Sequence, residues 1–151
     1  MAKETIKLKK YVDIIEQYKA ESAITPGHLL ELTSSDTVQP HSVAGGNQLA
    51  MFALEDEMQG NEIDDDYSTD DPVQVWVAVR GSIVNCLLAN GENASIGDYL
   101  ESAGDGTLQV YGPDSTGIYF PNQIVGQAVD AVDMSGSTGE DPDGRIQVRI
   151  I

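Results

Sequence analysis

The chain has 151 residues, and its 25 Asp and Glu against 8 Lys and Arg give a formal net charge of −17. This length fits one domain. So acidic a body repels free nucleic acid, and no apolar run approaches the ~18–20 residues of a membrane helix, so we expect neither a nucleic-acid nor a membrane partner. The single cysteine, Cys86, excludes an internal disulfide and a cysteine-built zinc site.

The charge is unevenly distributed along the chain. Residues 1–19 hold five lysines and three carboxylates, whereas residues 20–151 hold three arginines and 22 carboxylates. This break predicts an N-terminal arm (1–22) followed by one domain (23–151). Strong self-repulsion is relieved by salt, so one hypothesis is a source that lives in concentrated salt; the alternative is an ordinary acidic protein.

The N-terminal arm carries two apolar patterns. Ile6 and Leu8 alternate with polar residues, which predicts a strand. The next apolar residues recur at helical spacing and predict a short helix: Tyr11, Ile14, Ile15 and Tyr18. Such a helix needs a surface to pack on, either the protein's own core or a partner.

From residue 24 onward the pattern is typical of short β-strands separated by turns. Pro26-Gly27 and Asn90-Gly91 are turn signals. Strands are predicted at 28–32, 37–42, 48–54, 73–79, 83–89, 99–102, 107–111, 124–133 and 145–151. Strands this short and closely spaced predict a mainly β fold, a small β-barrel or β-sandwich.

Residues 27–41 also resemble residues 97–111, with five of fifteen positions identical at an offset of 70. The repeat predicts one hairpin design used twice; chance similarity is the alternative.

No catalytic pattern is evident. His28 and His41 are the only histidines, no G-x-S-x-G motif is present, and Cys86 lies in an apolar run typical of a buried thiol. The segment 55–72 holds nine carboxylates, but without an EF-hand pattern it reads as a solvated acidic loop more readily than as a cation site. We therefore expect no catalytic, cofactor or metal residues.

Two family resemblances can be compared. Ile63–Tyr67 and 136–139 are similar to two motifs of trimeric dUTP pyrophosphatases, but the phosphate-binding arginine motif is absent, because the first arginine is Arg80. A triphosphate handled with almost no cations is chemically unfavourable. A nucleotide hydrolase of this kind is one alternative function for the chain, and a surface-displayed glycan- or receptor-binding module is another.

The second resemblance covers residues 24–151 and rests on many weak motifs in order. It includes 24–27, 30–32, 51–57, 60, 63–67, 73–76, 80–81, 94–102, 105–108, 124–128 and 145–151. In these segments the chain resembles the capsid decoration (cement) proteins of tailed double-stranded DNA viruses. The resemblance implies a β-tulip-like domain without enzymatic activity. It also implies a homotrimer at three-fold and quasi-three-fold positions on the outside of the mature capsid, clamping neighbouring capsomers.

The partner implied by this resemblance is the major capsid protein, and the N-terminal arm is the candidate contact. An arm with alternating apolar residues can add a strand to an exposed sheet edge, and its lysines can meet an acidic surface. The candidate capsid-binding residues are Lys3, Ile6, Lys7, Leu8, Lys9 and Tyr11.

Overall fold

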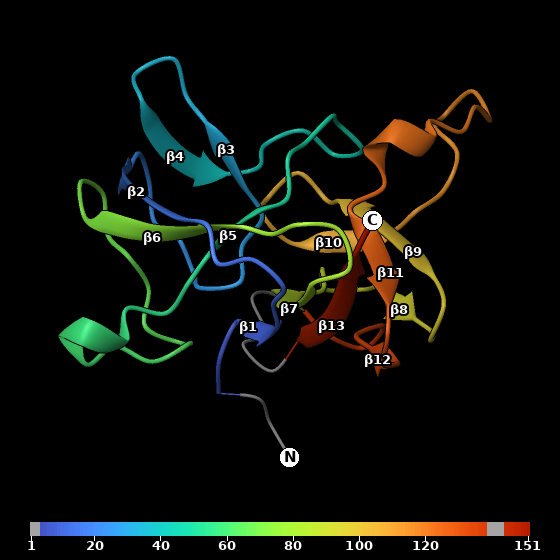
Figure 1. Ribbon diagram of the computed structural model, residues 1–151. Helices are drawn as coiled ribbons and strands as arrows, with labels where there is room; N and C mark the ends of the chain where they lie inside the picture. The colour runs from blue at the N-terminus through green and yellow to red at the C-terminus, as the bar shows by residue number, and fades with distance from the viewer. Residues whose placement is uncertain (1–3, 139–143) are drawn as a thin grey trace.

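Short strands make up nearly all the regular structure of the computed structural model, which describes residues 4–138 and 144–151 (Figure 1). The helical elements within these ranges are two single 3₁₀ turns, η1 (Glu57–Gln59) and η2 (Pro121–Gln123). None of the helices described is long and apolar enough to cross a membrane. The predicted mainly β class is confirmed, as a sandwich-like arrangement of sheets without a closed barrel.

A five-stranded sheet forms one lobe, on the left of Figure 1, with the order β3-β4-β2-β6-β5. Its strands pair antiparallel except β2 and β4, which run parallel. The strands are β2 (Ile15–Ala20), β3 (Leu30–Leu32), β4 (Thr37–Pro40), β5 (Met51–Ala53) and β6 (Pro72–Val77).

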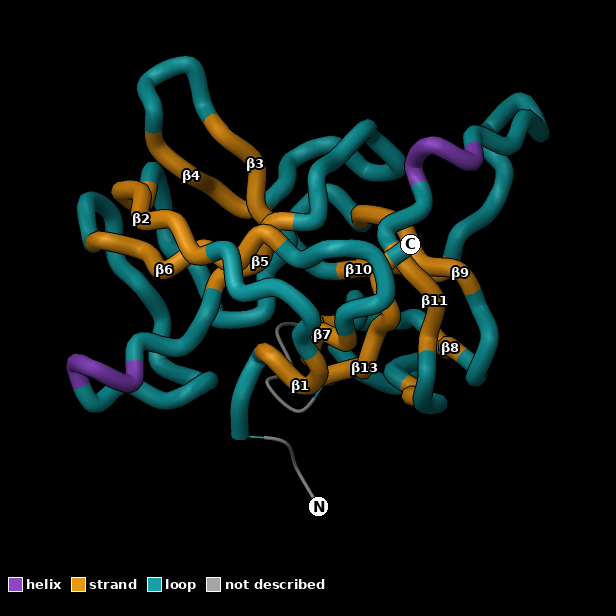
Figure 2. The backbone as a smooth tube through the Cα atoms, viewed as in Figure 1, coloured by secondary structure: helices purple, strands orange, loops and turns teal. Residues whose placement is uncertain are grey.

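A six-stranded sheet, order β1-β7-β13-β11-β9-β10, forms the other lobe, and a two-stranded sheet, β12-β8, lies beside it. The tube in Figure 2 shows the loops that connect these strands. The strands are β1 (Lys7–Lys9), β7 (Ile83–Leu87), β8 (Asn93–Ala94), β9 (Tyr99–Ser102), β10 (Leu108–Val110), β11 (Gly126–Ala128), β12 (Val132–Asp133) and β13 (Arg145–Ile150).

Strand β6 separates two apolar cores. Its alternate residues Val73 and Val75 face a smaller core within the five-stranded sheet. Trp76, on the opposite face of the strand, belongs to a larger core shared by both lobes. Cys86 is buried in the larger core as expected, and burial raises the pKa of its thiol.

The predicted helix over residues 11–18 is wrong. Residues 15–20 form β2, which pairs antiparallel with β6 and parallel with β4 at the centre of the five-stranded sheet. Ile14 and Ile15 keep 40% and 43% of their surface exposed, so no apolar helix face is being buried. Four apolar residues at helical spacing stabilise a short helix less than pairing with β4 and β6 on both sides stabilises the strand.

The sequence repeat corresponds to two hairpins with the same register. Glu31 lies opposite Gln39 in the β3–β4 hairpin, and Glu101 lies opposite Gln109 in the β9–β10 hairpin. In each, the Gln amide donates to the Glu carboxylate, at 2.6 Å and 2.9 Å. Identical residues thus make an identical cross-strand contact.

A candidate protein-interaction face

Five residues form one line across the outer side of the six-stranded sheet. Lys9 pairs with Ile83, Ile83 with Arg149, Arg149 with Gln127, and Gln127 with Tyr99. Paired residues project to the same side of a sheet, so these side chains form a continuous strip, here called the outer row. Arg149 and Tyr99 are exposed, and Ile83 and Gln127 are half-buried.

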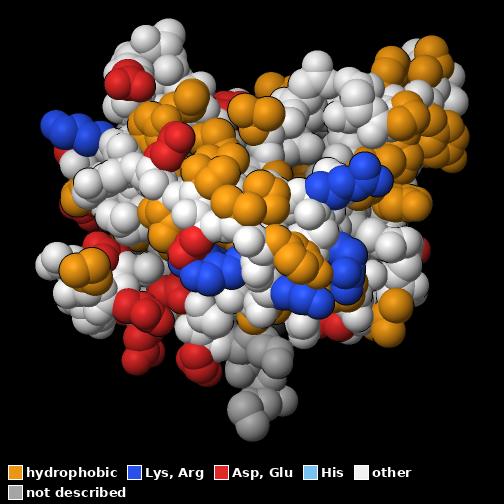
Figure 3. Space-filling model, in the orientation of Figure 1, with side chains coloured by type: hydrophobic (Ala, Val, Ile, Leu, Met, Phe, Trp, Pro, Cys, Tyr) orange, Lys and Arg blue, Asp and Glu red, His pale blue; other side chains and the backbone are white. Residues whose placement is uncertain are grey.

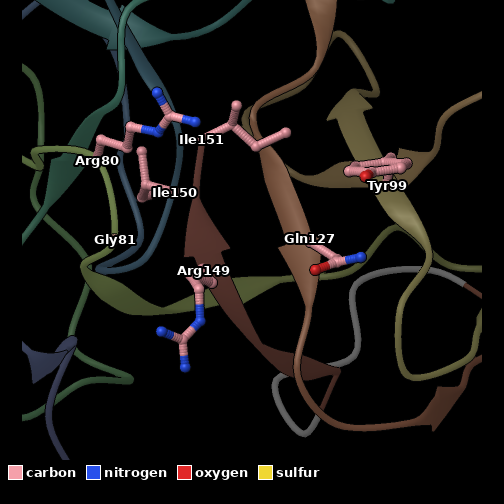
Figure 4. Close-up of a pocket in the computed structure, with 7 residues that line it drawn as sticks. All are labelled: Arg80, Gly81, Tyr99, Gln127, Arg149, Ile150 and Ile151. Atoms are coloured by element: carbon pink, nitrogen blue, oxygen red, sulfur yellow. The ribbon is translucent and has the colours of Figure 1, made fainter.

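A shallow hollow of about 290 Å³ lies along this strip (Figure 4). The turn between β6 and β7 and the end of β13 complete its wall, which contains two arginines and no acidic side chain. The lining residues are Arg80, Gly81, Tyr99, Gln127, Arg149, Ile150 and Ile151.

The electrostatics of this face contrast with the rest of the molecule. In Figure 3, Lys and Arg side chains gather over β1 and the end of β13, whereas acidic side chains gather around η1. No carboxylate of the described ranges lies within ion-pair distance of Arg80 or Arg149. Lys9 Nζ lies 5.6 Å from the centre of the Tyr11 ring, which is 61% exposed. The face therefore presents cations and aromatic surface that are free to meet a partner.

The predicted arm residues divide between this face and the core. Lys9 and Tyr11 are exposed, Lys7 and Leu8 are half-buried, and Ile6 is fully buried in the larger core. Lys3 lies outside the described residues. Ile6 is thus an internal anchor of the arm, and the role of the other residues in capsid contact stays a prediction.

Asp13 holds the arm lysines in place. Its carboxylate accepts from Lys7 Nζ at 3.0 Å and from Lys10 Nζ at 2.6 Å, and these hydrogen bonds lower its pKa. Exposed pairs of this kind add little to stability, so their effect is to orient the arm.

The acidic segment 55–72 is mostly solvated, with one exception. Glu55 is buried and accepts from the Thr5 hydroxyl and, at 3.2 Å, from the backbone N–H of Ile6. Asp64, Asp65 and Asp66 are exposed, and Tyr67 is buried, with its hydroxyl donating to the Leu54 carbonyl at 2.6 Å. No group of three or more metal-ligating side chains occurs in residues 4–138 and 144–151.

Both histidines are buried and hydrogen-bonded within the protein. His41 bonds Ser102 Oγ at 2.7 Å and the Asn47 carbonyl at 3.0 Å. Ser102 is fully buried, so this serine–histidine contact lies inside the protein and links the two lobes. His28 accepts from the backbone N–H of Thr25 through Nδ1 at 3.1 Å, and burial lowers its pKa to about 4.

A cluster of aromatic residues adjoins the hollow. The Tyr111 and Tyr119 rings pack with centres 5.8 Å apart, and Tyr111 N–H donates to the Tyr99 carbonyl at 2.8 Å. Tyr119 and Phe120 are 60% and 38% exposed. Sequence reasoning missed this cluster, and it missed Arg80, Arg149 and Gln127, because their proximity arises from strand order rather than from spacing along the chain.

Comparison with known proteins identifies a similar fold. No family model and no curated protein matches the chain. Among solved structures, the head fiber gp8.5 N base of bacteriophage phi29 matches with a TM-score of 0.59 and 16% sequence identity. The match covers 93% of this chain and 95% of the phage chain. At this identity the likeness shows a shared fold, extending over nearly the whole of both chains.

Proposed function

We propose that this chain is a structural virion protein that attaches to the outside of a phage capsid. The observation that carries the proposal is the fold shared with a phage head fiber base over 93% of the chain. The resemblance of residues 24–151 to capsid decoration proteins points to the same location independently. The proposed role is structural, not catalytic.

In its finer form the proposal is a homotrimer at three-fold and quasi-three-fold positions that binds the major capsid protein and clamps neighbouring capsomers. A protein that binds only the mature shell stabilises it by mass action. Three weak contacts in one trimer bind together with avidity. The exposed arm residues Lys9 and Tyr11 are the proposed arm contacts.

Co-sedimentation with bare, expanded capsids of the parent virus tests this proposal. We expect saturable binding by the full chain and a higher melting temperature of the decorated capsids. Light scattering should give the mass of three chains. Absence of saturable binding at both low and molar salt would contradict the proposal, and a monomeric mass would remove the trimer.

The arm is best tested by substitution, because a chain starting at Glu21 would lose β1 and β2 and with them the anchor Ile6. Lys9→Glu and Tyr11→Ala change exposed side chains only. Weaker capsid binding by these variants, with unchanged folding, would assign the arm to attachment. Unchanged binding would move the contact elsewhere on the domain.

The aromatic cluster favours a second candidate, a surface-displayed glycan-binding module. Exposed aromatic rings such as Tyr99 and Tyr119 supply large contact areas with a polar edge. A glycan array probed with the full chain and with Tyr119→Ala tests this candidate. A signal that the substitution abolishes would support it, and an array without signal would reject it.

A further inference from the structure

The chain consists of two structurally equivalent units joined by residues 79–82. Residues 15–78 form the first unit, and residues 83–138 and 144–151 form the second. In the first, β2 pairs with β6 from Ile15↔Trp76 to Lys19↔Pro72. In the second, β7 pairs with β13 from Ile83↔Arg149 to Leu87↔Arg145. The two ladders coincide pair for pair when β2 is shifted by 68 residues and β6 by 73.

Each remaining pairing of the five-stranded sheet also has a counterpart. The β5–β6 ladder repeats as β11–β13, and the β3–β4 hairpin as β9–β10. The parallel pairing of β2 with β4 at Ala20↔Val38 repeats as the parallel bridge Leu88↔Leu108. The single bridges recur too: Leu29↔Phe52 as Tyr99↔Gln127, and Ile24↔Tyr67 as Ala94↔Val132. The offset rises from 70 to 75 between β10 and β11, so the second unit has a loop longer by five residues, where Ile118, Tyr119 and Phe120 are exposed.

This equivalence assigns a counterpart to the outer row. In the first unit the corresponding positions are Ile15, Trp76, Phe52 and Leu29. Trp76, Phe52 and Leu29 are fully buried, and all three belong to the larger core, together with Leu100 and Val148 of the second unit. With these side chains the first unit docks on the second.

The same row in the second unit is only partly covered by the described chain, with Arg149 and Tyr99 exposed and Ile83 and Gln127 half-buried. Arg149 replaces Trp76, Gln127 replaces Phe52, and Tyr99, which is 46% exposed, replaces Leu29. The second unit therefore keeps the same row of strand positions but carries cationic, polar and aromatic side chains where the first unit has apolar ones.

We propose that the outer row of the second unit docks a carboxylate-bearing protein surface; under the proposed function, on which this inference rests, that surface belongs to the capsid shell. Arg80 and Arg149 line the hollow with no Asp or Glu side chain in its wall, although the chain has 25 such residues. Arginine forms planar, bidentate hydrogen bonds with carboxylates, and Tyr99 and Ile151 supply apolar contact area beside them.

A second copy of this chain is a less suitable occupant. The outer row of the second unit lacks the apolar side chains through which the first unit packs on the second, so a further copy could not pack on it in the same way. Repeat proteins end a stack of repeats with a polar outer face of this kind. Nucleic acid is disfavoured because the whole chain carries a charge of −17. A carboxylate-bearing protein fits both the cations and the aromatic surface.

The test is co-sedimentation with nuclease-treated bare capsids. Arg149→Glu and Arg80→Glu are compared with Lys19→Glu, which makes the same charge change at an exposed residue of β2, outside the hollow. We expect each arginine variant to bind about tenfold or more weakly, and Lys19→Glu to bind like the unmodified chain. Arg149→Gln, with a milder change, serves if a reversal variant does not fold.

The chemistry of the partner is tested with capsids whose surface carboxylates have been amidated. We expect the unmodified chain to bind them as weakly as Arg149→Glu binds untreated capsids. If the unmodified chain binds capsids and the arginine variants bind equally well, the inference is wrong and the proposed function stands. If the unmodified chain does not bind, both fail. Undiminished binding to amidated capsids, or binding lost on nuclease treatment, overturns the carboxylate partner.

Discussion

Phe52 and Gln127 occupy equivalent positions in the two units, which makes their truncation a direct test of the duplicated architecture. Phe52 is fully buried beside Trp76 in the core that joins the lobes. Replacing a buried Phe by Ala removes its transfer free energy and leaves a cavity, which costs about 3–5 kcal/mol. With a urea m-value of about 2 kcal/mol/M, Phe52→Ala should lower the unfolding midpoint by roughly 2 M.

The matched variant Gln127→Ala should change the free energy of unfolding by only about 1 kcal/mol, because its half-buried side chain lies on the outer row and loses an exposed hydrogen bond to the Gly97 carbonyl. Urea titrations of both variants, monitored by tryptophan fluorescence and circular dichroism in the same salt, measure the difference. Equal midpoints for the two variants would refute the assignment of one row to an internal interface and its counterpart to a free face.

Three further predictions concern salt, pH and glycine. If the source lives in concentrated salt, the melting temperature should rise steeply between low and molar salt as the charge of −17 is screened, and a small rise would count against that hypothesis. Burial lowers the pKa of His28 to about 4 from an ordinary 6.5, so its neutral form stabilises the fold above pH 6.5 and this contribution is lost as the pH falls toward 4. The unmodified chain should therefore lose about 2 kcal/mol more than His28→Gln between pH 7 and 5; parallel losses would refute this. Gly27→Ala should destabilise more than Gly97→Ala: both glycines have a φ near +95°, but a Cβ at Gly27 would lie 2.6 Å from Arg145 Nη1, whereas one at Gly97 meets nothing within 4 Å; equal urea midpoints would contradict the crowding.

Most strands were predictable because the chain alternates apolar and polar residues between strong turn signals. The segments predicted at 83–89 and 145–151 contain β7 and β13, and the segment predicted at 73–79 covers all of β6 except its first residue, Pro72. The predicted strand at 124–133 divides into β11 and β12, because the first part of this segment pairs with β13 and the last part pairs with β8.

The helix prediction failed for a physical reason. Tyr11, Ile14, Ile15 and Tyr18 have helical spacing, but only Tyr18 packs against a core and the other three are exposed, so the spacing does not mark one buried face. Strand pairing with β6 and β4 decides the conformation, and this pairing depends on residues more than fifteen positions away. A local pattern carries no information about it.

The candidate face was half predictable. Lys9 and Tyr11 could be identified as candidates because they lie in the N-terminal arm, which holds all the lysines of the chain. Arg149, Gln127 and Tyr99 carry no local signal, since each is one polar residue in a strand. Only the order β7-β13-β11-β9 brings them into line.

The position of β1 has a consequence for the order of folding. The first unit has a core of its own, formed by residues 20–75. By contrast, β1 pairs with β7, so Lys7 meets Val84, and Ile6 enters a core completed by β13 at the other end of the chain. Contacts of such high sequence separation form late. We therefore expect β1 to dock only after β7 and β13 have paired, although it is synthesised before either of them.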